Sequence, residues 1–501
     1  MSGRHFFTRA LSAVCCTILI GCSSATLIKE VPSHLKPGKL YLAPKTVEVA
    51  GRTFDTEEGF LVVTENPSDT LTRKNMLPVF RIRSVSKTPA EPIFWLNGGP
   101  GLSNMSYFRL SRLLQNHDFI LIGYRGVDGS IVLRSKEVEE AMEGVDGDLL
   151  SDASLHSLSQ AIELFSKNLT ARGIDIGHYT MTGVVSDLEA ARKGFGYETI
   201  NLLSFSYGTR VALIYGYLHP AVVFRSVMIS VNPPGHFTFS PRKTDEQLDY
   251  YDRLFAADSS NYDGRPLSQS IRTALGKMPS RWSLFKLDPG KIRVITFAML
   301  SQKRSAALVF DCYRAAEQGD YSGLYMLQRA YDFMMPSMMI WGDLFAKGST
   351  DFDPGIDYVS ELRDSTTVMG SPLSLLISGG AVGHWPVHRV PPGLNRIQQS
   401  DVQTLLVSGS VDFSTPAEYA TEELLPSLTY GKQVILREMG HVGDILNLQR
   451  PALEHLLLSF YDEGVADDSQ FKYDPMDFEP PVNLPVWAKV LYPFVLVLSL
   501  F

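Results

Sequence analysis

The sequence is poor in cysteine and has no excess of positive charge. Only four of its 501 residues are cysteines, and Cys15, Cys16 and Cys22 stand near the amino end. If processing removes or acylates those three, Cys312 is the single thiol of the mature chain, which excludes an intramolecular disulfide. Lysine and arginine number 46 against 54 acidic residues, a formal net charge of -8. A chain without a basic field lacks the electrostatic basis for binding a phosphate backbone, so we predict no nucleic-acid partner.

Long apolar runs are also missing, and none is long enough to cross a bilayer. The apolar stretch 10–20 follows Arg4 and Arg9 and ends in Leu-Ile-Gly-Cys at Cys22, which is typical of an export signal. This ending resembles the lipobox of bacterial lipoproteins, which implies cleavage before Cys22 and acylation of its thiol with fatty acids such as palmitate. Ser23 then implies delivery to the outer membrane, facing the periplasm. The alternatives are an ordinary signal peptide or an anchor helix.

What is present predicts a large α/β core. Short β-branched runs at 46–49 and 60–63 suggest an antiparallel start to a sheet, and the apolar runs 119–122 and 224–230 read as buried strands. Helical stretches between the later strands predict a mostly parallel central sheet covered on both faces. From about 235 to 400 this alternation stops, and helix-like segments rich in Tyr, Phe and Met take over.

One serine stands at a strand-turn-helix junction. Ser206 lies in Ser204-Phe-Ser-Tyr-Gly208, after the apolar run that begins at Ile200. A hydroxyl becomes a nucleophile when a sharp turn between small residues lifts it from the sheet toward a base. The usual pattern is G-x-S-x-G, and its first glycine is here Ser204, which tolerates special backbone angles less readily. Ser206 is the candidate nucleophile.

Two further residues complete a triad in chain order. Asp412 follows the apolar strand-like run 404–409 and is the candidate orienting acid, while His441 follows the run 434–436 and is the candidate base. Backbone N–H groups of Gly98 and Gly99, in the turn after the run 92–96, and of Tyr207 are the candidate oxyanion donors. The order Ser, Asp, His with each group just past a strand is that of α/β hydrolases.

These segments resemble the proline iminopeptidase and tripeptidyl aminopeptidase family of α/β hydrolases. The resemblance runs from about 40 to 460 and rests on the following segments: Asn97-Gly-Gly-Pro-Gly101, Tyr124-Arg-Gly-Val-Asp-Gly-Ser130, Asp187-Leu-Glu-Ala-Ala-Arg192, Gly196-Tyr197, Ser204-Phe-Ser-Tyr-Gly-Thr209, Gly409-Ser-Val-Asp-Phe-Ser-Thr-Pro416 and Gly440-His441. It implies the α/β-hydrolase fold with an inserted helical cap, and a serine exopeptidase that acts at the free amino end of peptides with no metal or organic cofactor. Asn97, Gly123-Tyr124 and Ser204 depart from the usual residues near the pocket and leave substrate preference open.

The expected organisation is a signal peptide at 1–22, a tether at 23–40, the first part of the hydrolase core at 41–235, a helical cap at 236–400, the second part of the core at 401–462 and a C-terminal extension at 463–501. The apolar tail 484–501 is interrupted by Lys489 and Pro493, so it either packs on the fold or, as we expect, lies in the membrane interface beside the lipid. In the cap, Asp245, Glu246 and Asp249 with Tyr250 and Tyr251 either line an amine-binding mouth or, as the pattern favours, form a solvated acidic helix face.

The functional expectation is an exported aminopeptidase that works through an acyl-enzyme on Ser206. A carboxylesterase for small esters is the second interpretation, because the same triad cleaves both bonds and only the cap discriminates. A catalytically inactive binding protein that kept the hydrolase fold is the third. The predicted partners are therefore a peptide or small ester and the membrane.

Overall fold

The computed structural model describes residues 27–107, 110–258, 263–353, 355–388 and 390–498. The predicted signal peptide and Cys22 lie outside these ranges. Within the described ranges, no helix combines the length and the apolarity that a bilayer crossing requires.

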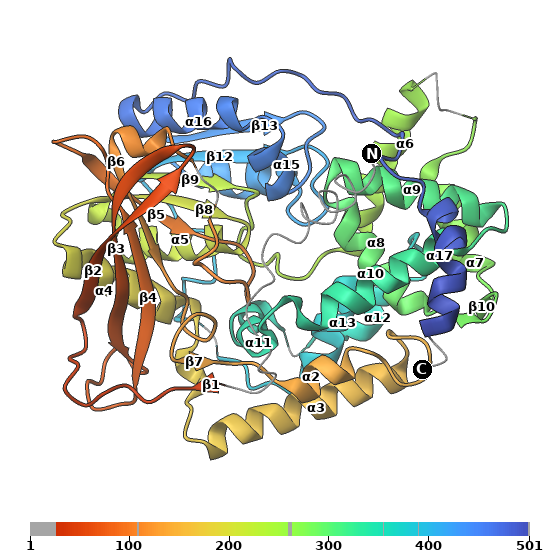
Figure 1. Ribbon diagram of the computed structural model, residues 1–501, viewed down its shortest axis with the longest axis horizontal. Coiled ribbons are helices and arrows are strands. Elements are labelled where there is room, and N and C mark those ends of the chain that lie inside the picture. Colours follow the sequence, from red (N-terminus) through yellow and green to blue (C-terminus); the bar gives the residue numbers. More distant parts are fainter. Residues whose placement is uncertain (1–26, 108–109, 259–262, 354, 389, 499–501) are drawn as a thin grey trace.

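A nine-stranded sheet forms one half of the molecule (Figure 1), with the strand order β13-β12-β9-β8-β5-β6-β4-β3-β2. Its strands are β2 (Leu40–Val49), β3 (Arg52–Thr64), β4 (Lys74–Ile82), β5 (Ala90–Leu96), β6 (His117–Ile122), β8 (Ile200–Phe205), β9 (Val223–Ile229), β12 (Gln403–Gly409) and β13 (Gly431–Leu436). Strand β3 pairs antiparallel with both β2 and β4, and β4 pairs antiparallel with β6. All pairings from β6 across to β13 are parallel. The predicted α/β class, with its antiparallel start and mostly parallel sheet, is confirmed.

Helices cover both faces of this sheet because successive side chains of a buried strand point to opposite sides. Phe94 and Leu202 belong to the core on the face of α4 (Met181–Phe195) and α5 (Tyr207–Leu218). Their chain neighbours Trp95 and Leu203 belong to the core on the opposite face, under α15 (Val442–Asn447) and α16 (Arg450–Leu458). Strands β6 and β8 are buried at every position, as their apolar sequences predict.

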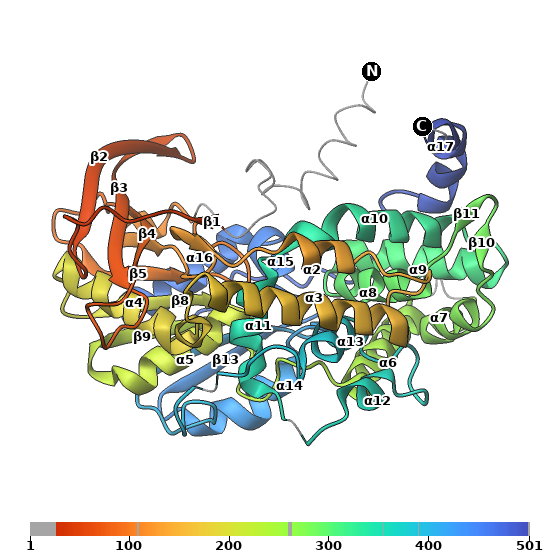
Figure 2. The same cartoon turned by 90° about the horizontal axis from the view of Figure 1, so that it is seen from below.

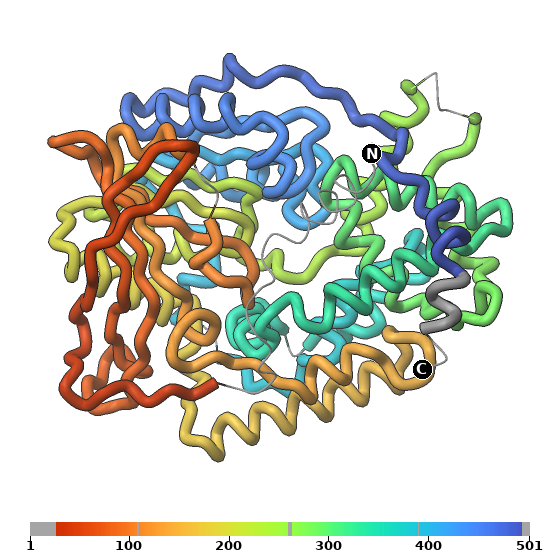
Figure 3. The backbone as a smooth tube through the Cα atoms, viewed as in Figure 1, coloured from red at the N-terminus to blue at the C-terminus, as the bar shows by residue number. Residues whose placement is uncertain are grey.

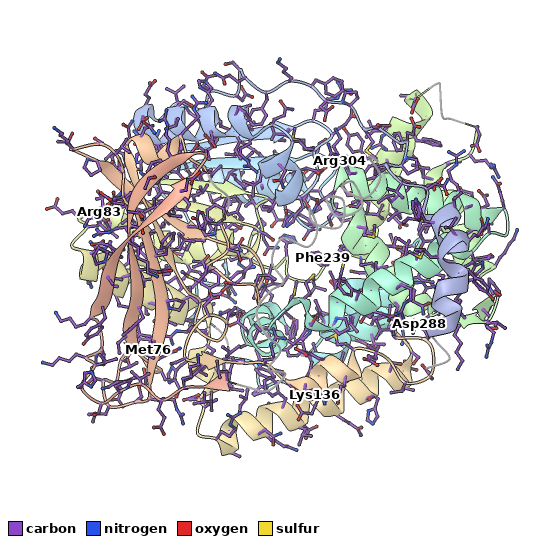
Figure 4. All side chains as sticks on the ribbon, viewed as in Figure 1. Met76, Arg83, Lys136, Phe239, Asp288 and Arg304 are labelled. Atoms are coloured by element: carbon purple, nitrogen blue, oxygen red, sulfur yellow. The ribbon has the colours of Figure 1, made fainter. Side chains whose placement is uncertain are left out.

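The chain between β9 and β12 forms a helical insertion beside the sheet. Its elements are α6 (Pro241–Ala257), α7 (Leu267–Gly276), the hairpin β10 (Arg281–Trp282) and β11 (Phe285–Lys286), α8 (Pro289–Leu300), α9 (Lys303–Glu317), α10 (Ser322–Met338), α11 (Trp341–Gly348), α12 (Tyr358–Arg363) and α13 (Pro372–Ala381). Phe239, on the segment that enters the insertion, lies between its helices and the sheet (Figure 4) and packs its ring on Phe297 of α8 at 4.9 Å. The insertion therefore begins where β9 leaves the sheet.

Two helices that precede the candidate nucleophile in sequence lie against the insertion (Figure 2). They are α2 (Lys136–Ala141) and α3 (Asp152–Ala171). The chain enters α2 from the short strand β7 (Ile131–Val132), which pairs antiparallel with β1 (Leu27–Ile28). Tyr331 of α10 donates its hydroxyl to Met142 O at 2.8 Å, and Leu149 N donates to Asp288 Oδ1 at 3.0 Å. These contacts bind the insertion to the first part of the chain as well as to the sheet.

The chain after α16 crosses from the sheet to the far end of the insertion (Figure 3) and ends in α17 (Leu484–Leu498). Helix α17 packs mainly on α10. Lys489 pairs at 2.6 Å with Asp320, which precedes α10, and the Tyr492 hydroxyl lies 2.7 Å from the hydroxyl of Ser283, in the turn between β10 and β11. Val486 and Val490 on its outer side are more than half exposed. One side of the apolar tail thus packs on the fold, and contact with a membrane remains a prediction.

Candidate active site

Ser206 occupies a strained turn between β8 and α5. Its φ of 49° and ψ of -120° lie in a region that residues with a side chain rarely adopt. The turn is held by a hydrogen bond from Ser206 N to Ile229 O at 3.0 Å and by one from Thr209 N to Ser206 O at 2.9 Å. Because α5 begins at Tyr207, the hydroxyl stands at the N-terminal end of a helix. This is the backbone geometry of a nucleophile elbow.

The two small residues that flank the elbow, Ser204 and Gly208, are under different steric constraints. Ser204 is still within β8 and has no positive φ, and its buried hydroxyl donates to Val227 O at 3.0 Å. Serine therefore occupies this position without backbone strain. Gly208 is different, because a Cβ there would lie 2.2 Å from Leu96 O. The helix can approach the end of β5 only with glycine at this position.

Asp412 and His441 meet after β12 and β13. Asp412 is fully buried, and its two carboxylate oxygens lie 3.0 and 2.8 Å from His441 Nδ1. Ser414 N and Thr415 N each donate to Asp412 Oδ1 at 2.9 Å, and the Thr415 hydroxyl donates to Oδ2 at 2.8 Å. This arrangement fixes the imidazole with Nδ1 toward the acid and leaves Nε2 for a substrate-side proton.

The three candidate residues share one edge of the sheet. Since β8, β12 and β13 run parallel, Ser206, Asp412 and His441 all follow the carboxyl ends of their strands. Within the described part of the chain, no hydrogen bond joins the Ser206 hydroxyl to the imidazole. Catalytic hydrogen bonds are often long in enzymes without substrate and tighten in the complex.

The candidate oxyanion donors lie beside the serine. A Cβ on Gly98 would be 3.3 Å from Ser206 Cβ, so the turn after β5 packs directly on the elbow. The N–H of Tyr207 belongs to the first turn of α5, where N–H groups have no partner within the helix. Gly99 follows in the same turn with a φ of 129°. The glycines let the main chain approach the point where a carbonyl oxygen would become charged.

Several residues that position these groups were not found from the sequence. Asn104 accepts from Asn97 N at 2.7 Å and donates to Trp95 O and Ile122 O, which joins the turn to β5 and β6. Ser301, at the end of α8, accepts from His441 N at 2.7 Å. The sequence carries no signal for these contacts, because no motif shows which way the Asn104 side chain or the Ser301 backbone oxygen points.

An acidic cavity of about 360 Å³ opens between helix α6 of the insertion and the chain on both sides of Asp412. Its lining consists of Glu246, Gln247, Asp249, Tyr250, Arg253, Ser410 and Glu418. Three of the five residues considered for an amine-binding mouth are thus in the lining. The other two point elsewhere: Asp245 accepts from Val368 N, and Tyr251 is buried against Phe413. Among the described residues, His, Cys, Asp and Glu side chains form no group of three or more suited to a metal ion.

The fold and the site define an α/β hydrolase. Residues 91–424 match the model of the alpha/beta hydrolase fold family. This match covers more than half of the chain, and the chain belongs to that family. The family assignment agrees with the order of the strands and with the serine, acid and histidine that follow them.

Among individual proteins, the chain is similar to a tripeptidyl aminopeptidase of Streptomyces lividans, with 25% identity over 207 residues. The match covers 36% of this chain and 38% of that enzyme, so it spans well under half of the relative. Among solved structures, it is similar to a serine hydrolase from the bacterium Cycloclasticus zankles (12% identity, TM-score 0.37, 85% of this chain and 100% of that chain). It is also similar to a meta-cleavage product hydrolase from Pseudomonas fluorescens (11% identity, TM-score 0.35, 84% and 98%).

Proposed function

We propose that the protein is a serine hydrolase that releases residues from the amino end of peptides. The observation that carries this proposal is the pairing of Asp412 with His441 at the same edge of the sheet as a serine held in a strained elbow. His441 takes the proton from Ser206 as its oxygen attacks the carbonyl carbon, and Asp412 stabilises the imidazolium. The N–H groups of Gly98, Gly99 and Tyr207 bind the oxyanion. The protonated His441 then gives its proton to the leaving amine, and water releases the acyl group.

The choice of peptide amino ends has two supports. One is the similarity of part of the chain to a tripeptidyl aminopeptidase. The other is the acidic cavity, whose lining carries the carboxylates of Glu246, Asp249 and Glu418 against the single guanidinium of Arg253. It opens beside Ser410, two residues before Asp412. A net negative cavity favours a protonated amine over a neutral ester.

A substrate panel tests this function. We expect turnover of aminoacyl and tripeptidyl naphthylamides with a free amino end, and at least a hundredfold lower kcat/KM once that amine is acetylated. Ser206→Ala and His441→Ala should each abolish turnover, and a fluorophosphonate should label Ser206 in the folded wild type. Turnover of short p-nitrophenyl esters with none of the peptides would indicate a carboxylesterase. A folded protein without a phosphonate adduct would indicate a binding protein.

The cavity can be tested separately from the triad. Glu246→Gln combined with Asp249→Asn should raise KM for free-amine peptides about thirtyfold and leave ester hydrolysis unchanged, since each of the two lost ionic contacts weakens amine binding by about 1 kcal/mol. Glu361→Gln, which neutralises an exposed carboxylate on α12, is the matched control. Equal KM values for the double variant and the control would remove the cavity from the amine site.

We also propose that the chain is exported and anchored by lipid on Cys22. The support is the sequence alone, namely the positive start, the short apolar stretch and the lipobox-like ending. Incorporation of labelled palmitate into the wild type, with none in Cys22→Ser, is the expected result, together with recovery in the outer-membrane fraction. Wild-type protein without label would leave only an ordinary signal peptide or an anchor helix.

A further inference from the structure

Helix α11 of the insertion contains a completely buried ion pair. Asp343 and Lys347 both have no exposed side-chain surface, and Lys347 Nζ lies 2.5 Å from Asp343 Oδ1. Burial raises the pKa of the Asp343 carboxyl and lowers the pKa of the Lys347 ammonium, although each charge favours the ionised form of the other. A buried pair of this kind adds little net stability over apolar side chains of the same size. Its contacts point to another role.

The pair joins the insertion to two loops of the hydrolase core. Asp343 Oδ2 accepts the backbone N–H of Gly101 at 3.0 Å. Lys347 Nζ donates to Arg125 O at 3.0 Å. Gly101 lies on the loop that follows β5 and carries Gly98 and Gly99, while Arg125 lies on the loop that follows β6. One ion pair of the insertion therefore contacts both loops at the edge of the sheet where Ser206 stands.

A second hydrogen bond joins the insertion to the loop that carries Gly101. Ile340 N, directly before α11, donates to Gly101 O at 2.9 Å, so both polar groups of Gly101 are bonded to the insertion. Gly101 has a φ of 88°, and a Cβ there would lie 2.9 Å from Ile340 O. A Cβ on Gly126, next to Arg125, would lie 2.6 Å from Asp343 Oδ1. Glycine at 101 thus lets the loop approach the backbone of Ile340, and glycine at 126 leaves room for the Asp343 carboxylate.

We propose that Asp343 is a positioning residue for the oxyanion donors, with Lys347 holding its charge and direction. This inference rests on the proposed function. Gly98 packs on Ser206, and only Pro100 separates Gly99 from Gly101, so a displacement of Gly101 moves the donor N–H groups relative to the serine. Oxyanion stabilisation requires donors at about 3 Å from the developing charge, and losing one donor costs about 10²- to 10³-fold in kcat. The insertion thus sets the geometry of the reaction as well as covering it.

The decisive variant replaces the pair by apolar residues of similar size, Asp343→Leu with Lys347→Met. Because no unpaired charge remains, Tm should stay within about 3 °C of the wild type. We expect kcat to fall about 10- to 100-fold, KM to change by less than about threefold, and fluorophosphonate labelling of Ser206 to slow by the same factor as kcat. A purely structural pair would lower Tm and leave both rates unchanged in the folded protein.

A second variant tests the acceptor itself. Asp343→Asn with Lys347→Met keeps an oxygen for Gly101 N–H and removes both charges, so its labelling rate should stay within about threefold of the wild type. The control Lys291→Met with Asp332→Leu removes an ion pair inside the insertion that does not touch these loops. Wild-type labelling of the Leu/Met variant, or equally slow labelling of the Asn/Met variant, would overturn the positioning role alone. A wild type that is not labelled would overturn the proposed function.

Discussion

Arg210, on helix α5 directly after Ser206, forms a bidentate ion pair with Asp351 of the insertion. Arg210 Nη1 lies 3.0 Å from Asp351 Oδ2, and Nη2 lies 2.9 Å from Oδ1. Both side chains are buried, and Asp351 also accepts from Gly235 N where the chain enters the insertion. The insertion is therefore fixed to α5 through Arg210 and to the loop after β5 through Gly101.

Removing one partner of this pair should destabilise the fold strongly. In Asp351→Leu the guanidinium stays buried without a counter-charge, and we expect the free energy of unfolding to fall by about 3 to 5 kcal/mol. Arg210→Met in the same chain removes the unpaired charge and should restore most of that loss. Urea unfolding followed by circular dichroism measures both. A single variant that loses less than about 1 kcal/mol would show that water reaches the pair.

The hydroxyl of Thr415 should contribute to catalysis through Asp412. Thr415→Val removes one donor to Asp412 Oδ2 and leaves the two backbone donors to Oδ1 in place. A hydrogen bond to a charged group is worth about 1.5 to 3 kcal/mol, part of it in the resting state, so we expect kcat to fall about tenfold. Asp412→Asn, which disrupts the tautomer of His441, should lower kcat by about 10³- to 10⁴-fold.

Thr421→Val is the control for that series, because its hydroxyl bonds to Ala417 O and Gln433 and has no contact with the triad. All variants are compared by kcat on one peptide substrate and by the rate of fluorophosphonate labelling. Equal rates for Thr415→Val and Thr421→Val would mean that the backbone donors alone orient Asp412.

The sequence predicted that the three candidate triad residues each follow a strand, because a short apolar run and the turn after it are local signals. Ser206 follows such a run, and so do Asp412 and His441. Local signals failed for the contacts of Asp343 with Gly101 and of Asp351 with Arg210, which join residues about 240 and 140 positions apart. An acid on a helix is normally solvated, and only the folded chain reveals that these two are buried.

The lining of the acidic cavity could be predicted from the sequence only in part. Positions 245 to 251 formed one acidic and aromatic group in the sequence, but successive residues of a helix point about 100° apart. Helix α6 consequently directs Glu246, Asp249 and Tyr250 into the cavity, and Asp245 and Tyr251 into other contacts. The sequence identified a helix with clustered acidic and aromatic residues, and the phase of that helix determined which of them line the cavity.

Acid should remove a contribution that Glu189 makes to stability. Burial opposes its ionisation, but hydrogen bonds from Arg192, Tyr215 and Lys193 outweigh burial and lower the pKa of Glu189 to about 2. A carboxyl with a folded pKa below its unfolded value stabilises the fold above the unfolded pKa of 4.5 and loses this effect as the pH falls toward 2. We expect Glu189→Gln to cost on the order of 2 kcal/mol at pH 7 and progressively less between pH 4.5 and 2.

The measurement for Glu189 is urea unfolding of the wild type and Glu189→Gln at several pH values, with the exposed Glu140→Gln as control. The control should differ little from the wild type at any pH. A difference between wild type and Glu189→Gln that stays constant down to pH 2 would contradict the lowered pKa.

The packing of helix α17 on α10 can be tested through the reactivity of the Cys312 thiol. A Cβ on Gly323 of α10 would lie 2.8 Å from Cys312 Sγ and 3.0 Å from Pro485 Cγ, so the buried thiol lies close to the first turn of α17. Burial also raises the pKa of the Cys312 thiol, which disfavours the reactive thiolate.

The variant Ala488→Glu tests this packing, because it puts a carboxylate where a methyl group is only 2% exposed. Burying that carboxylate is costly, so α17 should separate from α10. Alkylation of Cys312, quantified by peptide mass mapping, should become at least tenfold faster, whereas Val490→Glu on the exposed side of the same helix should leave the rate unchanged. Equal alkylation rates in all three proteins would show that other elements protect the thiol.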